Sequence, residues 1–259
     1  MTRRALIGHT GFVGSNLDRQ LAVTDRYNSR NVGEMRGQSY DEIVCAGVRA
    51  VKWWANQNPE ADWAGIVTLL DALSGVKAGR FTLISTVDVY RDPVGVDEAT
   101  LIDAAGLHPY GLHRWRVEDF VRRTFANAQI VRLPGLFGPG LKKNLIYDVM
   151  TGGDLSGFDA RSSFQFYDLA RLGHDLAVAA GVDAPVVNLA VEPVTVSQVV
   201  GQLTGDSYAH HTARPPVRYD FRTRFAAAWG REGGYVATAA ECLAAIGQFA
   251  RAGSGGPGR

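Results

Sequence analysis

The sequence is poor in cysteine, with only Cys45 and Cys242 among its 259 residues. Two cysteines so far apart have the spacing of neither a disulfide framework nor a zinc site. Two of the histidines, His9 and His113, are candidate ligands, but neither has a second ligand residue at the spacing of a metal site. We therefore expect no metal, and a reducing compartment such as the cytoplasm suits the chain.

Neither sign of charge is in excess, because 27 lysines and arginines face 26 aspartates and glutamates. No long block of one sign occurs, so the electrostatic footprint of a nucleic-acid-binding protein is missing. No stretch approaches the roughly 20 apolar residues of a membrane span, and the first apolar segment is too short for a secretory signal. We expect a cytoplasmic protein that binds a small-molecule substrate, with neither nucleic acid nor membrane as a partner.

What the sequence does have is an alternation of short apolar runs with amphipathic segments. Strands are expected at residues 5–7, 26–32, 42–46, 81–85, 129–133 and 185–190. Helices are expected at residues 13–21, 59–75, 109–125, 168–180, 195–203 and 238–251. Strands that alternate with helices demand parallel pairing, so the order predicts an α/β fold with a doubly wound parallel sheet.

Gly8, Gly11 and Gly14 form a G-x-x-G-x-x-G turn after the first expected strand. Such glycines leave no Cβ in the way of a pyrophosphate lying on the N-terminus of the following helix. In a chain with 30 glycines this spacing is expected by chance roughly 0.4 times, so the context decides. A turn between the first strand and the first helix is what a dinucleotide site requires, which favours cofactor binding over a purely structural turn.

The turn resembles the T-G-x-x-G-x-x-G loop of the extended short-chain dehydrogenases/reductases, the NAD(P)-dependent epimerase/dehydratase family. Three further motifs follow in the family's order. Ile84-Ser-Thr-Val-Asp-Val-Tyr90 resembles its S-S/T-x-x-V-Y segment, Tyr110 starts its Y-x-x-x-K helix, and Arg132-Leu-Pro-Gly-Leu-Phe-Gly-Pro139 resembles its R-x-x-x-x-Y/F-G-P strand exit. Together the motifs cover residues 4–200.

The resemblance implies a division of the chain. A Rossmann-type NAD(P)-binding domain would take residues 1–134 and about 168–192, and a small substrate-binding lobe about 135–167 and 193–252, with a flexible tail at 253–259. Family members often pair through two long helices, here those near 59–75 and 109–125, so a homodimer is an expectation.

Two catalytic positions match the family residue by residue. Thr86 takes the place of the hydroxyl that hydrogen-bonds the substrate oxygen. Tyr110 takes the place of the acid/base that moves a proton as hydride passes to or from the nicotinamide. The resemblance therefore implies hydride chemistry at a carbinol or carbonyl carbon.

Arg114 departs from the family, which has lysine at this position. Because Tyr110 and Arg114 are four residues apart on one helix, they are neighbours on one face. One positive charge at about 5 Å, with an effective dielectric near 20, lowers a phenol pKa by about 2 units. Arg114 is expected to tune Tyr110 in this way, but a planar guanidinium does not copy the lysine's contact with the nicotinamide ribose.

Two alternatives stay open. Asp88 stands where family members that eliminate water from nucleotide sugars carry a glutamate base, so the chain is either a dehydratase with Asp88 as base or an enzyme in which Asp88 only caps the loop. Val87, where some dehydratases have an acid, weakens the first reading. The loss of lysine at Arg114 also admits a non-catalytic NAD(P)-binding protein.

Several further residues are expected to contact the cofactor. Ser29 and Arg30 lie in the region that closes the second expected strand, where an acidic residue would hold the ribose hydroxyls of NAD. They suit a 2′-phosphate and favour NADP. The resemblance adds the positions that line the cofactor: Thr10, Phe12, Val13, Ala46, Gly47, Ser85, Tyr110, Arg114, Leu133 and Pro134. Asp62 replaces an asparagine that the family often carries.

The substrate is expected to meet Thr86 and the segment after the fifth strand. Gly135 stands where many nucleotide-sugar enzymes have a contacting asparagine, and Lys142, Lys143 and Asn144 follow in the loop that usually approaches the substrate diphosphate. The lysines either neutralise a diphosphate or form a solvated basic loop. We expect a nucleotide sugar or a related polar metabolite.

Overall fold

A six-stranded sheet forms the centre of the protein. The computed structural model describes residues 2–254. The strands have the order β2-β1-β3-β4-β5-β9, and every neighbouring pair is parallel. They are β1 (Arg4–Ile7), β2 (Asp25–Tyr27), β3 (Ser39–Cys45), β4 (Lys77–Thr86), β5 (Ala128–Leu133) and β9 (Val186–Asn188). The predicted α/β fold with a doubly wound parallel sheet is confirmed.

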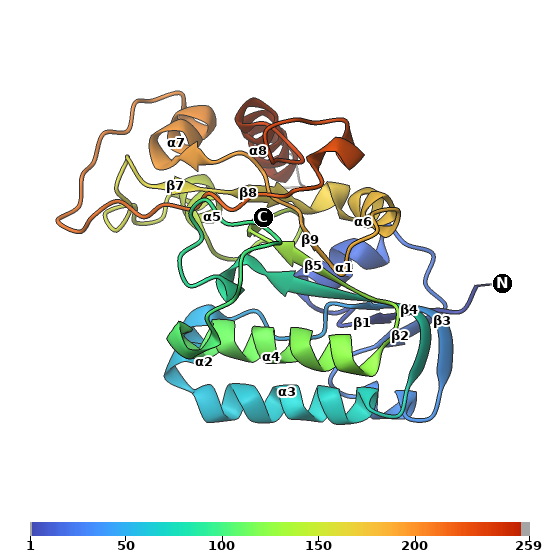
Figure 1. Ribbon diagram of the computed structural model, residues 1–259. Coiled ribbons are helices and arrows are strands. Elements are labelled where there is room, and N and C mark those ends of the chain that lie inside the picture. The colour runs from blue at the N-terminus through green and yellow to red at the C-terminus, as the bar shows by residue number, and fades with distance from the viewer. Residues whose placement is uncertain (1, 255–259) are drawn as a thin grey trace.

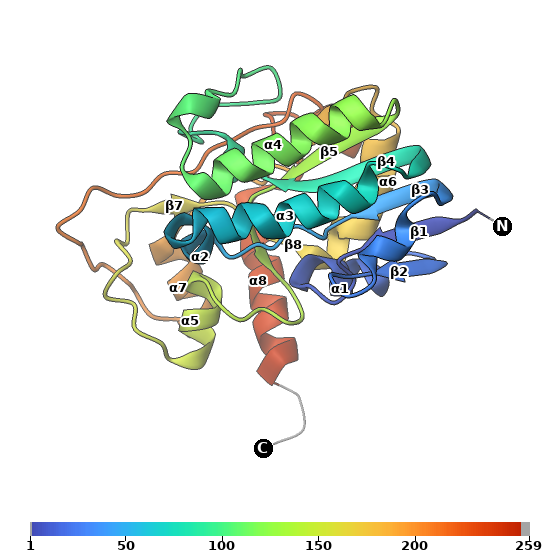
Figure 2. The ribbon, with the colours of Figure 1, turned by 90° about the horizontal axis from the view of Figure 1, so that it is seen from below.

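Helices cover both faces of this sheet (Figures 1 and 2). One face carries α3 (Pro59–Leu73) and α4 (Pro109–Thr124), with α2 (Lys52–Gln57) beside them, and the other carries α1 (Phe12–Asp18) and α6 (Leu172–Ala180). Successive residues of a strand point to opposite faces. Ala5 and Ile7 accordingly pack in the core under α3 and α4, and Leu6 packs in the core under α1 and α6. Burial on both faces explains why the strands read as continuous apolar runs.

The chain reverses its direction across the sheet at β1. The strand β2 pairs with one edge of β1, and the next strand, β3, pairs with the other, so Ile7 has Tyr27 and Cys45 as its neighbours. Open parallel sheets bind ligands at the carboxyl ends of the strands beside such a reversal. The glycine turn follows β1 and Ala46-Gly47 follows β3, so both lie at this place.

The segments assigned to the substrate lobe form their own apolar cluster. They contain two small sheets, β6 (Gly135–Phe137) with β8 (Phe166–Asp168) and β7 (Ser163–Phe164) with β10 (Val194–Thr195), and the helices α5 (Leu145–Thr151), α7 (Val196–Thr204) and α8 (Ala239–Ser254). Their core includes Phe137, Ile146, Val199 and Ile246. Figure 1 shows these elements gathered on one side of the main sheet.

The end of α8 corrects one expectation. The helix continues to Ser254, so the first two residues of the expected tail 253–259 are helical. The other five, 255–259, lie outside the described residues.

Two of the motifs meet in a buried ion pair. The guanidinium of Arg132 on β5 lies 2.7 and 3.0 Å from the carboxylate oxygens of Glu118 on α4. The same guanidinium donates to the hydroxyl of Tyr90, and Ser85 donates to Glu118 at 2.6 Å. The pair thus ties β4, β5 and α4 together, and the hydroxyl of Ser85, expected to contact the cofactor, points into this network.

Sequence patterns were least accurate for short elements, and they missed the strands β6, β7, β8 and β10. The expected strand 26–32 ends at Tyr27, because the side-chain oxygens of Asn28 and Asn31 accept backbone N–H groups and form a turn. The helices α2 and α5 were not expected. Within residues 2–254, no helix is long and apolar enough to cross a membrane, and no cluster of His, Cys, Asp and Glu has the arrangement to hold a metal ion.

Candidate active site

The glycine turn packs against the exit of β3. Gly8 has φ of +87°, and a Cβ there would lie 2.3 Å from the carbonyl oxygen of Ala46. A Cβ on Gly14 would lie 2.0 Å from the carbonyl oxygen of Gly8. Both positions therefore require glycine for packing alone. Gly11 is exposed where α1 begins, with no side chain capping the helix, and it leaves the outer face of the turn clear.

The residues expected to hold the adenosine end lie beside this turn. The imidazole of His9 lies 3.3 Å from the side-chain nitrogen of Asn28, which joins the turn to the end of β2. Ser29 and Arg30 come next and are exposed. The guanidinium of Arg30 is therefore open to solvent beside the end of β2.

The other expected cofactor residues follow the carboxyl ends of three strands. Thr10 and Gly47 are exposed, and Phe12, Val13 and Ala46 are partly buried. Leu133 and Pro134, at the end of β5, are buried. A Cβ on Gly47 would lie 2.8 Å from a methyl group of Ile7, so this glycine also serves packing.

Thr86, Asp88 and Tyr110 come together after β4. The hydroxyl of Thr86 caps the short 3-10 turn Val87–Val89 by accepting the N–H of Asp88 at 3.2 Å. Tyr110 lies in the first turn of α4, and the next residue, Gly111, lets this helix approach the backbone of Asp88, since a Cβ on it would lie 2.2 Å from that carbonyl oxygen. The structure thus brings together three of the four residues that were expected to be catalytic, and Arg114 is the fourth.

Tyr110 is a buried phenol that keeps its proton at neutral pH. Its side chain is 7% exposed. Burial raises the pKa of Tyr110 to about 12, although the positive charges of Arg114 and Lys52 and a hydrogen bond with Thr86 lower it, and Asp88 adds to the rise. A protonated phenol beside a threonine hydroxyl is a donor for a carbonyl oxygen.

Arg114 is a neighbour of Tyr110, as its spacing predicts, but its donors are occupied. The guanidinium lies over the phenol ring at 3.9 Å from its centroid. It makes a two-pronged contact of 2.5 and 3.1 Å with the carboxylate of Asp62 and donates to the backbone carbonyls of Arg49 and Tyr110. The remaining donor, Nε, is buried and has no partner among the described residues. Arg114 therefore packs on the Tyr110 ring, and its one donor without a partner in residues 2–254 is buried, so it offers no accessible donor to a ribose.

The patterns missed a lysine in the same place. The ammonium of Lys52 lies 2.5 Å from Oδ1 of Asp88. The helix that carries it, α2, is fixed to α4 because the side-chain oxygen of Asn56 accepts the N–H of Tyr110 at 3.0 Å. The sequence indicates Lys52 only weakly: it is one of four lysines in the chain, and it lies five residues after Gly47, an expected cofactor residue.

The expected substrate residues are placed in a loop and at a sheet edge. Gly135 is exposed in β6, and a Cβ there would lie 2.9 Å from the carbonyl oxygen of Gln165. Asn144 caps α5 through a 3.0 Å bond from the N–H of Tyr147, a role that its place before an apolar helix indicates. Its side chain thus holds the loop, whereas Lys142 and Lys143 are exposed.

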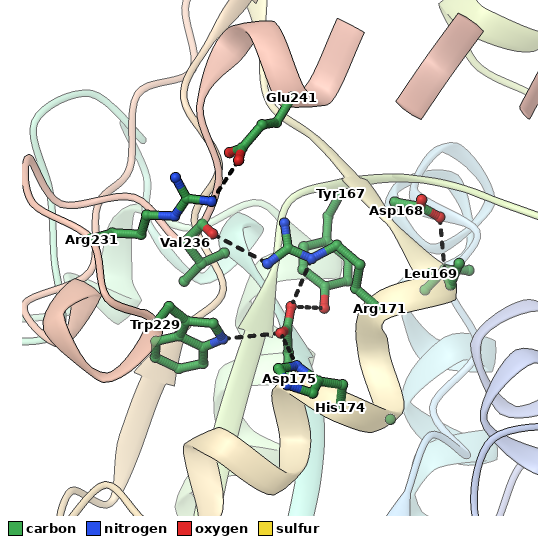
Figure 3. Close-up of polar contacts among 12 residues, drawn as sticks. Tyr167, Asp168, Leu169, Arg171, His174, Asp175, Trp229, Arg231, Val236 and Glu241 are labelled. Atoms are coloured by element: carbon green, nitrogen blue, oxygen red, sulfur yellow. Dashed lines mark hydrogen bonds and ion pairs between the residues drawn. The ribbon is translucent and has the colours of Figure 1, made fainter. Parts of the chain in front are cut away.

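A second Tyr-x-x-x-Arg pair lies elsewhere and is structural, as its position indicates. Figure 3 shows Tyr167 and Arg171 around Asp175, which is fully buried. Asp175 accepts from the hydroxyl of Tyr167 at 2.6 Å and from the indole of Trp229 at 3.0 Å, and Arg171 lies 3.3 Å away. The cluster fixes α6 to the turn that carries Trp229.

The comparisons with known proteins rest on structure. No family model and no curated protein matches the chain by sequence. The dTDP-4-dehydrorhamnose reductase of Bacillus anthracis, solved with NADP, is 17% identical with a TM-score of 0.72, and the match covers 96% of this chain and 98% of that one. The dTDP-glucose 4,6-dehydratase of Streptomyces venezuelae, solved with NAD, is 18% identical with a TM-score of 0.72, covering 98% of both chains.

A third enzyme shares the architecture less closely. The UDP-glucose 4-epimerase of Thermotoga maritima, solved with UDP-glucose, is 16% identical with a TM-score of 0.60, and the match covers 91% of this chain and 88% of that one. All three similarities concern the course of the backbone, since the identities are low. The chain therefore has the fold of the extended short-chain dehydrogenases/reductases, the family that its motifs resemble.

Proposed function

We propose that the protein is an NAD(P)-dependent enzyme that moves hydride at a carbinol or carbonyl carbon of a nucleotide sugar or a related polar metabolite. The observation that carries the proposal is the placement of Thr86 and Tyr110 at the carboxyl end of β4. This is the sheet edge where the glycine turn follows β1 at the reversal of strand order. A cofactor site and a proton donor thus share one edge.

The glycine turn and its surroundings fit a dinucleotide. Gly11 leaves the outer face of the turn without a Cβ, and the small residues Ala46 and Gly47 stand at the neighbouring strand exit. These residues would hold the pyrophosphate and the adjoining riboses, and Arg30 would meet a 2′-phosphate. When bound, the nicotinamide supplies or accepts the hydride.

The residues of this chain handle the proton. In the reducing direction, the phenol of Tyr110 gives its proton to the substrate oxygen while the carbon receives hydride, and the hydroxyl of Thr86 holds that oxygen in place. Arg114 supports the ring of Tyr110 from its buried side. The raised pKa of Tyr110 keeps the phenol protonated before the reaction, which suits reduction of a carbonyl.

The first experiment measures cofactor binding and turnover on the purified protein. Calorimetry with NADH, NADPH, NAD⁺ and NADP⁺ should show binding, and NADPH should be oxidised with a nucleotide 4-keto sugar such as dTDP-4-dehydrorhamnose, followed by its absorbance. Tight retention of an oxidised cofactor without net consumption would instead indicate an epimerase or a dehydratase. A protein that binds none of the four cofactors would contradict the proposal.

Arg30 tests the preference for NADP. Arg30→Ala removes an exposed guanidinium beside the end of β2 and should weaken NADPH about tenfold, while NADH changes by less than about twofold, because only NADPH carries the 2′-phosphate. The dissociation constants are measured by calorimetry, with Arg19→Ala as control. Arg19 is also exposed, but it lies after the last residue of α1, away from the glycine turn, and bonds to Asn16. Equal losses for both cofactors would remove Arg30 from this role.

Two other functions have a specific observation in their favour. Asp88 lies beside Thr86 and Tyr110, as a dehydratase base requires, but both of its carboxylate oxygens already accept hydrogen bonds, one from Lys52 and one from Thr86. A non-catalytic cofactor-binding protein is favoured by the occupied donors of Arg114. A protein that binds cofactor, but with candidate nucleotide sugars shows neither a redox change of the cofactor nor an elimination product, would be such a non-catalytic protein.

A further inference from the structure

Lys52 lies beside Asp88, and its side chain is partly open to solvent. Its ammonium bonds to Asp88 at 2.5 Å, and Tyr219 is a near enough neighbour to raise the pKa of the ammonium. Tyr219 is itself held by a stacked contact with Phe164, with 5.8 Å between ring centroids. The lysine is therefore positioned from three directions, by α2, by the turn after β4 and by an aromatic pair of the small lobe.

The two cations near Tyr110 differ in accessibility. The side chain of Lys52 is 42% exposed, whereas that of Arg114 is 5% exposed and its partner Asp62 is 1% exposed. Arg114 is held behind the phenol ring by a carboxylate and two backbone carbonyls. Of the two cations, Lys52 is therefore the one that is open to solvent.

We propose that Lys52 is a second cation, beside Arg114, that stabilises Tyr110 as a phenolate during turnover, and that it compensates for the lysine that α4 lacks. The inference rests on the proposed function. It assigns a positive charge needed for that function to α2, outside the helix α4 that carries Tyr110. When the phenol gives its proton to the substrate oxygen, a negative charge remains on Tyr110, and the ammonium of Lys52 offsets it until solvent returns a proton. Lys52 acts through Tyr110 and is a positioning residue.

Several charged and titratable groups around Tyr110 enter this balance. They are Lys52 from α2, Asp88 from the turn after β4, Arg114 and His108 from α4, and Tyr219 near Lys52. Burial alone would lower the pKa of Lys52, but Asp88 and Tyr219 outweigh it and the pKa is raised, so the ammonium is charged at neutral pH. The removal of Lys52 leaves Asp88 unpaired, and both changes raise the pKa of Tyr110.

The test compares Lys52→Met and Lys52→Arg with Lys77→Met. Lys77 is exposed at the start of β4, at the opposite edge of the sheet. For Lys52→Met we expect kcat at pH 7 to fall about tenfold and KM to change little, because a less stabilised phenolate makes Tyr110 a weaker proton donor. Lys52→Arg should restore kcat, and Lys77→Met should match the natural protein. An unchanged kcat in Lys52→Met would overturn the proposal.

A second readout does not need turnover. Burial lowers the pKa of His108, and the charge of Lys52 lowers it further. The imidazole titration of His108, followed by NMR and identified by its loss in His108→Gln, should move to higher pH in Lys52→Met and stay in place in Lys77→Met. If cofactor binds but nothing turns over, the proposed function fails while this titration still tests the charge. A titration of His108 that Lys52→Met leaves unmoved would overturn the assignment of the charge to Lys52.

Discussion

Tyr110→Phe is expected to lower kcat by about a thousandfold while cofactor affinity changes by less than about threefold. The substitution removes one oxygen atom and keeps the ring that lies under Arg114. The proton donor is lost, but the packing of α4 on the turn after β4 is retained, because that contact is made by the backbone at Gly111. The loss should therefore appear in kcat and not in stability.

The measurement needs a matched control, because a buried hydroxyl is lost as well. Tyr40→Phe serves this purpose: Tyr40 is also buried, at the start of β3, and its hydroxyl bonds to that of Tyr27 at 2.7 Å. Its removal at the far edge of the sheet should leave kcat within about twofold. A Tyr110→Phe variant that retains full turnover would remove Tyr110 from the chemistry, and equal losses in both variants would indicate a general loss of folding.

The sheet was predictable because its strands are apolar on both faces and alternate with long helices. Periodicity carries less information in short elements. The expected strand at 26–32 ends early because two asparagine side chains form a turn, and α2 begins at Lys52 without a capping side chain to signal it. In α5 the signal was present: Asn144 precedes an apolar helix as a cap, but the resemblance drew attention to it as a substrate contact.

The contacts of the candidate site that lie within one motif could be predicted from the sequence. Thr86 and Asp88 are two residues apart, and Tyr110 and Arg114 share a helix face, so local spacing places both pairs. Contacts between distant segments have no such signal. Lys52 meets Asp88 across 36 residues, and only the fold brings them together.

Two departures from the family pattern turn out to be one feature. The sequence shows Asp62 in place of asparagine and Arg114 in place of lysine as separate observations. In the structure, the two side chains form a buried ion pair, and His113 adds a 2.7 Å bond to the same carboxylate. The longer guanidinium thus has a charged partner, which explains how an arginine is tolerated behind Tyr110.

Asp62→Asn is expected to lower the free energy of unfolding by about 3 kcal/mol at pH 7, because it leaves a buried guanidinium without its carboxylate. Urea unfolding measures the loss. The control is Asp71→Asn, which breaks an exposed ion pair with Arg36 and should cost less than about 1 kcal/mol. Similar losses in both variants would mean that the buried ion pair of Asp62 stabilises the fold no more than the exposed ion pair of Asp71.

The same pair predicts a dependence on pH. Burial alone would raise the pKa of Asp62, but the bonds from Arg114 and His113 outweigh it and the pKa is lowered. A carboxyl with a lowered pKa in the folded state stabilises the protein above its unfolded pKa of about 3.9, and the stabilisation is lost as the pH falls below that value. The difference in unfolding free energy between the natural protein and Asp62→Asn should therefore be constant from pH 7 to about pH 5 and shrink towards pH 3. A difference that stayed constant to pH 3 would show that Asp62 contributes through its shape and hydrogen bonds, not through its charge.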